Sequence, residues 1–65
     1  MKIGDKFIEL ESSAEKVIIQ LTKYIPEKDS YECIATWPSA EEKWFYLESL
    51  NPIGRKEILK SWKKI

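Results

Sequence analysis

Few side chains in this chain could carry out chemistry, because its 65 residues include one cysteine and no histidine. Histidine is the most common general base and the most common metal ligand in proteins. Cys33 alternates with Tyr31, Ala35 and Trp37, and no histidine is present to activate its thiol, so we interpret it as a small core residue. The residue types therefore argue against nucleophilic catalysis, and we predict that the protein is not an enzyme.

Two pairs of neighbouring acids, Glu41-Glu42 and Glu9-Glu11, are the other candidates for catalysis, since many hydrolases use two carboxyl groups. Glu41 and Glu42 belong to a loop or to the first turn of a helix, where solvation or capping accounts for them. Glu9 and Glu11 are expected on the polar face of a strand. Neither pair has the spacing of a metal site, and two glycines cannot build a phosphate-binding loop, so we expect no metal and no cofactor.

Charge is distributed unevenly along the chain. Residues 51–65 carry five of the eleven basic side chains and one acid, a net charge of +4, whereas residues 1–50 carry −4. Four lysines near a tryptophan form a candidate nucleic-acid-binding site: Lys56, Lys60, Trp62, Lys63 and Lys64. The isoelectric point near 6.2 argues against this function, because nucleic-acid-binding domains often exceed about 9. We keep it as the alternative.

The chain has eight aromatic residues, a large number for so small a core. Three are consecutive, at positions 44–46, and in a strand at least one of them must point away from the core. Either the C-terminal segment or a partner covers that ring. Tyrosine and tryptophan are enriched at the centres of protein interfaces. We therefore predict a protein-binding region made of Trp37, Trp44, Tyr46, Glu41 and Glu42.

Alternating apolar and polar residues predict a β-rich body. A first strand follows the Gly4-Asp5 turn, and residues 31–37 alternate up to Pro38. The run before them should form a hairpin with them through a turn at residues 26–29.

Two segments allow a second interpretation. Residues 12–25 and 39–50 each begin with a capping-box pattern, Ser12 with Glu15 and Ser39 with Glu42. Both are also rich in β-branched or aromatic residues, which favours strands. We predict a mainly β fold, either a small SH3-like barrel or a four-stranded antiparallel sheet with a C-terminal α-helix. The alternative is an α+β fold with helices at 12–25 and 39–50.

Residues 51–65 are predicted to form one amphipathic helix, capped by Asn51 and Pro52, although Gly54 indicates a slightly later start. Its apolar stripe consists of Ile58, Leu59, Trp62 and Ile65. This stripe should pack on the acidic body and leave the lysines outermost, since the two parts have opposite charge.

The order of these features resembles the small SH3-like β-barrel proteins common in bacteria and their phages. The resemblance covers about the first fifty residues: the Gly4-Asp5 entry, the hairpin, then Trp44-Phe45 and residues 47–50. It implies binding of proteins, peptides or nucleic acid more than catalysis. The fold by itself assigns no function.

Chain length predicts a single domain, residues 1–65, with a β body at 1–50 and the helix at 51–65. We expect a cytoplasmic protein, because one cysteine allows no internal disulfide and no signal-peptide pattern is present. The longest nearly apolar stretch, VIIQL, is far shorter than the roughly 20 residues of a membrane span. We predict a small accessory or regulatory protein of bacterial or phage origin that binds another protein, with a homodimer as a further expectation because the core is small.

Overall fold

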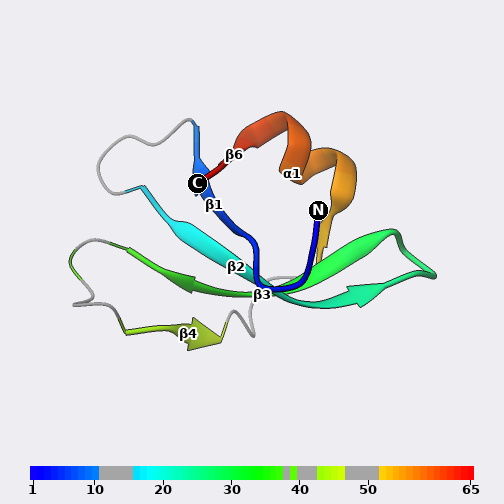
Figure 1. The fold of residues 1–65 in the computed structure, drawn as a ribbon, viewed down its shortest axis with the longest axis horizontal. Coiled ribbons are helices and arrows are strands. Elements are labelled where there is room, and N and C mark those ends of the chain that lie inside the picture. The colour runs from blue at the N-terminus through cyan, green and yellow to red at the C-terminus, as the bar shows by residue number, and fades with distance from the viewer. Residues whose placement is uncertain (11–15, 38, 40–42, 47–51) are drawn as a thin grey trace.

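The computed structural model describes residues 1–10, 16–37, 39, 43–46 and 52–65 (Figure 1). Within these ranges the chain forms six short strands and one helix. In chain order they are β1 (Lys6–Glu9), β2 (Ile18–Ile25), β3 (Ser30–Thr36), β4 (Phe45–Tyr46), β5 (Ile53–Gly54), α1 (Arg55–Ser61) and β6 (Trp62–Lys64). The prediction of a mainly β fold with a helix in the C-terminal segment is confirmed at this level.

All strand pairs are antiparallel, and the order across the sheet is β4-β3-β2-β1-β6, with β5 also paired to β3. The sheet curls into a half-barrel, and α1 lies over its concave side (Figure 1). The first four strands follow one another in space as in sequence. The last strand returns to pair with the first.

The β2–β3 hairpin forms as predicted, with its turn at residues 26–29. A bulge interrupts its register between Leu21 and Lys23, where the Thr22 hydroxyl donates a hydrogen bond to the Glu32 carbonyl at 3.0 Å. An extra residue in one strand shifts its alternation. Leu21 and Tyr24 consequently share a face despite being three residues apart.

For residues 12–25 the strand prediction is confirmed and the alternative helix is wrong in the part that the structure describes, because Ile18–Ile25 is a strand. In the segment 39–50, Phe45–Tyr46 is a strand paired with Ala35 and Ile34. This confirms the strand interpretation there, while residues 40–42 and 47–50 lie outside the described ranges. At Ile18–Ile25 and Phe45–Tyr46 the preference of β-branched and aromatic residues for a sheet is met.

The core lies on the concave side of the sheet. Its buried apolar residues are Phe7, Ile19, Leu21, Tyr31, Cys33, Ala35 and Ile58. The alternation predicted for β3 is confirmed, since residues 31, 33 and 35 all point inward. Each fully buried aliphatic side chain contributes about 1.5–3 kcal/mol, so a fold this small depends on a few such residues.

The predicted helix over 51–65 is corrected in its extent. The helix begins at Arg55, after β5, and ends at Ser61, and Trp62 already has extended backbone angles of φ −130° and ψ 149°. The last strand pairs with β1 through hydrogen bonds from Leu10 N–H to the Ser61 carbonyl and from Ile65 N–H to the Lys6 carbonyl, both 3.0 Å long. Hydrogen bonding along the edge of β1 therefore outweighed helix propensity, which is only a weak preference.

This change of structure divides the predicted apolar stripe. Ile58 is fully buried and Trp62 is half-buried against the core, whereas Leu59 and Ile65 are 61% and 59% exposed. Only part of the predicted stripe therefore packs on the body. The sheet edge, not the helix surface, determines where Trp62 lies.

Candidate functional site

An apolar hollow of about 170 Å³ opens on the concave side of the half-barrel. Its lining comes from four neighbouring strands and from β5, and consists of Glu9, Val17, Ile19, Ala35, Trp37, Ile53 and Trp62. We call these seven residues the hollow. Its volume is far above the roughly 10–15 Å³ that admits one water molecule. It is below the roughly 300–1,000 Å³ of typical small-molecule sites, so it suits a single side chain.

Strand register aligns four of the lining residues in one row across the sheet. Glu9 is opposite Trp62, and the Glu9 N–H donates to the Val17 carbonyl at 3.1 Å. The pairing of Ile18 with Thr36, continued by one residue, places Val17 opposite Trp37. The row Trp62, Glu9, Val17 and Trp37 therefore has a tryptophan at each end. Three strand spacings separate the two, about 14 Å along the curved sheet.

The floor of the hollow is the next row inward, where Ile19 pairs with Ala35 and both are fully buried. Val17, Ile53 and Trp62 pack against this core and are only partly buried themselves. The walls are thus apolar and held by the sheet. A ligand entering here would meet a surface that is already formed.

Of the described residues that line the hollow, Glu9 is the charged one. The backbone bonds of Leu10 and Ile65 lie on either side of the Glu9–Trp62 pair, which makes it a non-hydrogen-bonded pair of the antiparallel ladder. Such pairs have Cα atoms about 4.5 Å apart and bring their side chains closest together. Among the described residues, no hydrogen bond or ion pair involves the Glu9 carboxylate. The Glu9 carboxylate, a hydrogen-bond acceptor, thus lies beside the Trp62 indole. It has no partner from the described part of the chain.

Among the residues predicted to bind protein, Trp37 and Trp44 lie on different faces of the sheet. Trp37 lines the hollow, whereas Trp44 is 36% exposed and has the Lys6 ammonium 5.4 Å from its ring centre. Lys6 precedes the buried Phe7 in β1, so it points to the convex face, and Trp44 lies with it there. Tyr46 belongs to β4, opposite Ile34. Glu41 and Glu42 lie outside the described residues.

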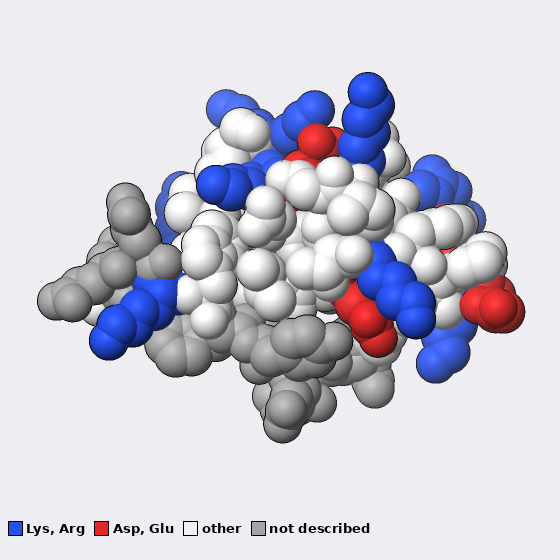
Figure 2. Space-filling view, turned by 60° about the horizontal axis from the view of Figure 1, so that its bottom comes forward, with Lys and Arg blue, Asp and Glu red and all other residues white. Residues whose placement is uncertain are grey.

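The residues predicted to bind nucleic acid are also dispersed. Lys56 and Lys60 are exposed on α1, Trp62 lines the hollow, and Lys63 and Lys64 alternate on β6. The Lys64 ammonium is 3.6 Å from an Asp5 carboxylate oxygen. On the face shown in Figure 2, Lys and Arg side chains are spread around the outline and uncharged side chains occupy the centre. The single basic helix face that the sequence predicted does not form, because the helix ends before Trp62.

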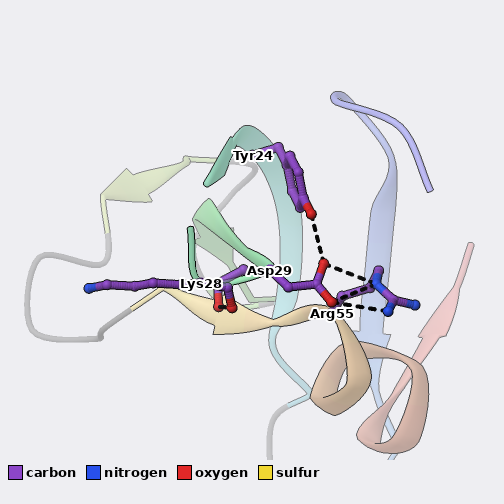
Figure 3. Close-up of polar contacts among 5 residues, drawn as sticks. Tyr24, Lys28, Asp29 and Arg55 are labelled. Carbon is purple, nitrogen blue, oxygen red and sulfur yellow. Dashed lines mark hydrogen bonds and ion pairs between the residues drawn. The ribbon is translucent and has the colours of Figure 1, made fainter. Parts of the chain in front are cut away.

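A second polar cluster, Tyr24, Asp29 and Arg55, joins the hairpin turn to the start of α1 (Figure 3). We call it the clamp. Arg55 Nε lies 3.1 and 3.0 Å from the two Asp29 carboxylate oxygens, Arg55 Nη2 lies 3.0 Å from Oδ2, and the Tyr24 hydroxyl donates to Oδ1 at 2.8 Å. The Arg55 N–H also donates to the Asp29 carbonyl at 2.9 Å. Every carboxylate oxygen of Asp29 thus has at least one donor.

The backbone conformation of Asp29 suits its position in the turn, where it pairs with Arg55 and Tyr24. Its φ of +46° lies in the left-handed region, which aspartate tolerates better than most residues. In the same turn the Ser30 hydroxyl donates to the Lys28 carbonyl at 2.9 Å. The hydrogen bonds from Arg55 and then from Tyr24 lower the pKa of Asp29, and the bond to Asp29 raises the pKa of Tyr24. The clamp is therefore a satisfied, structural ion pair.

Cys33 is buried, and this burial raises the pKa of its thiol to about 11. The thiol donates a weak hydrogen bond to the Tyr31 carbonyl, with a sulfur–oxygen distance of 3.6 Å. A thiol with such a pKa is protonated at neutral pH and is a poor nucleophile. Among the described residues, no three acidic, cysteine or histidine side chains are grouped to hold a metal ion.

Sequence reasoning missed Glu9, Val17, Ile53 and Trp62 as parts of one site. One signal was available, because Phe7 and Glu9 alternate onto the same face of β1 and Phe7 is a core residue. Glu9 was instead assigned to a polar face. Trp62 could be placed beside it only once the β1–β6 pairing was known.

Comparison with known proteins gives no assignment: no family model, no curated protein and no solved structure matches this chain. In the described part of the chain, no helix has the length and apolar character needed to cross a membrane.

Proposed function

We propose that this chain is a small, non-catalytic binding module that acts through protein–protein contacts. In this proposal it is an accessory or regulatory protein of bacterial or phage origin that works in the cytoplasm. The observation that carries the proposal is the hollow, whose apolar walls and aromatic ends are partly open although the floor beneath them is fully buried. Clusters of large aromatics around a pocket are typical of the centres of protein interfaces.

We also propose that the fold is an SH3-like barrel. Two features support this: four strands follow one another across the sheet in sequence order, and a short helix precedes a final strand that pairs with β1. A barrel of this kind has its sheet edges largely paired, which leaves loops and open ends for binding.

The contact region that we propose is centred on Trp37, the one residue common to the predicted region and the hollow. Trp44 lies on the opposite face beside Lys6 and is a suitable internal control. Apolar floors of this kind are formed before binding, so a partner loses little affinity to reorganisation of the site.

Selection of peptides from a random library on the purified protein tests this function. Enriched peptides are then added to isotope-labelled protein, and the three indole N–H signals are followed by NMR. We expect the Trp37 and Trp62 signals to shift and the Trp44 signal to stay. Failure to enrich any peptide, or shifts confined to Trp44 and its surroundings, would contradict the proposal.

Nucleic-acid binding is the alternative function. It is supported by the exposed Lys56 and Lys60 on α1, and it is weakened by the position of Trp62 in the hollow and by the pairing of Lys64 with Asp5. Electrostatic association with phosphates is strongest at low salt. Titration of labelled single- and double-stranded DNA and RNA in about 50 mM salt therefore tests it, and binding that K56A/K60A abolishes would favour this alternative.

A further inference from the structure

We propose that the hollow takes the side chain of a lysine or arginine from a partner protein. This inference rests on the proposed function and specifies the chemistry of the residue that the partner inserts. It follows from three properties of the hollow: its apolar walls, the indole beside its charged residue, and a carboxylate without a partner among the described residues.

The walls suit the stem of such a side chain. Val17, Ile19, Ala35 and Ile53 present only aliphatic groups. Lysine and arginine have three or four methylene groups that pack against apolar surface while the charged end stays near water. The size of the hollow, about 170 Å³, fits one extended side chain better than a cofactor.

The indole of Trp62 suits the charged end. Tryptophan gives the strongest attraction for a cation placed over an aromatic ring, at distances up to about 6 Å from the ring centre. This chain already contains such a contact on its other face, where the Lys6 ammonium is 5.4 Å from the centre of the Trp44 ring. A basic residue in the hollow would repeat that contact with Trp62.

The Glu9 carboxylate determines which charge the ligand should carry. It is half-buried directly opposite Trp62. By contrast, Asp29 is paired with Arg55 and Asp5 with Lys64. Among the described residues, no lysine or arginine lines the hollow to neutralise Glu9. An anionic ligand would be repelled, and an apolar one would leave the carboxylate without a counter-ion in less water. A cation with an apolar stem satisfies both the carboxylate and the walls.

Short peptides test this inference directly. The probes are glycine-flanked pentapeptides with lysine, arginine, norleucine or glutamate at the centre. Each is added at matched ionic strength, up to about 10 mM so that millimolar binding is detected. Indole and backbone signals of the isotope-labelled full chain are followed by NMR. We expect the lysine and arginine peptides to shift Trp62 and Glu9, norleucine to shift them less at equal concentration, and glutamate to leave them unchanged.

A matched pair of variants isolates the carboxylate. Glu9→Gln keeps the size of the side chain and removes its charge, so the lysine peptide should bind about two- to fivefold more weakly, the range of a half-exposed ion pair. Affinity for the norleucine peptide should not fall. Glu27→Gln, in the exposed hairpin turn, removes the same charge elsewhere and should have no effect.

Two results would overturn the inference. Equal binding of the lysine and norleucine peptides, unchanged by Glu9→Gln, would mean that the hollow binds apolar side chains, and the proposed function would stand. No shift at Trp62 or Glu9 with either basic peptide would also overturn it. Whether the proposed function fails as well is then read from the library selection, which does not presuppose a basic residue.

Discussion

The clamp and the hollow each contain a carboxylate, and their surroundings differ. Asp29 in the clamp receives hydrogen bonds from Arg55 and from the Tyr24 hydroxyl, all between 2.8 and 3.1 Å. Glu9 in the hollow receives none from the described residues and faces Trp62. Both are on the surface of a chain whose net charge is zero.

This difference distinguishes a carboxylate with a structural role, in the clamp, from a carboxylate that can bind a ligand, in the hollow. A carboxylate that already has its donors holds two elements together, and another ligand would have to displace Arg55 to use it. A carboxylate beside apolar walls gains most from a cation that arrives from outside, because nearby apolar groups restrict its hydration. Surface charges are common on small domains, so the pairing of each acid tells more about its role than its exposure.

Ile58 supports both regions, because it is the fully buried residue of the helix that begins at Arg55 of the clamp and ends at Ser61, just before Trp62 of the hollow. Ile58→Ala should lower the free energy of unfolding by about 2–5 kcal/mol, the usual range for deleting a buried isoleucine side chain. Such a loss could unfold so small a domain, so Ile58→Val, with an expected loss of about 0.5–1.5 kcal/mol, is the second variant.

Urea denaturation followed by tryptophan fluorescence measures both losses. Leu59→Ala is the control, since the neighbouring Leu59 is 61% exposed and should change stability by less than about 0.5 kcal/mol. Equal losses for Ile58→Val and Leu59→Ala would mean that the helix does not join the two regions through Ile58.

Trp62→Ala affects the hollow more than the clamp. We expect peptides selected on the wild-type protein to bind at least about tenfold more weakly, because truncating a central aromatic residue commonly costs more than 1.4 kcal/mol of binding energy. Calorimetry measures the change, with Trp44→Ala as the control on the opposite face. A larger effect of Trp44→Ala would move the contact region away from the hollow.

Asp29→Asn removes the ion pair of the clamp and should leave the hollow unchanged. It removes the charge that pairs with Arg55, so we expect a lower melting temperature, by less than that of Ile58→Ala. Peptide binding by the folded protein should be unchanged. A double-mutant cycle with Arg55→Gln measures the coupling. Purely additive effects would show that the pair does not stabilise the protein.

The pH dependence of stability should report on the ion pairs of the protein, the clamp among them. Hydrogen bonds lower the pKa of Asp29 in the clamp, and a hydrogen bond from the Lys2 N–H, then the Lys64 charge, lower that of Asp5. Their contribution is present above the ordinary aspartate pKa of about 3.9 and is lost as the pH falls through the lower folded values.

Tyr24 acts in the opposite direction. Its hydrogen bond to Asp29 raises its pKa, so its contribution is present below about pH 10 and is lost as the pH rises above that value. Melting temperatures from pH 2 to 11 should thus fall at both ends of the range. Asp29→Asn should reduce both falls, and curves identical to wild type would contradict the pKa shifts of the clamp.

Much of the sheet could be predicted from the sequence, because its signals are local. Alternation from Tyr31 to Trp37 fixed β3 and its inward face, and the turn at residues 26–29 fixed the hairpin. The end of the helix could not be predicted. Ile58, Leu59, Trp62 and Ile65 do have helical spacing, and only the unpaired edge of β1, a long-range feature, makes residues 62–64 a strand.

The candidate site was harder to predict for the same reason. Trp37 was identified from its residue type and position after β3. Glu9 and Trp62, 53 positions apart, become neighbours through strand pairing alone. The clamp was missed because an aspartate in a turn and an arginine after a glycine are each common without being paired.

The hollow and its proposed ligand depend most on the position of Trp62 opposite Glu9 in a strand. Nuclear Overhauser effects measure it directly, because the α-protons of a non-hydrogen-bonded antiparallel pair lie close together. We expect a strong effect between the α-protons of Glu9 and Trp62. Helical contacts continuing from Lys60 to Ile65, with no effect between Glu9 and Trp62, would contradict it.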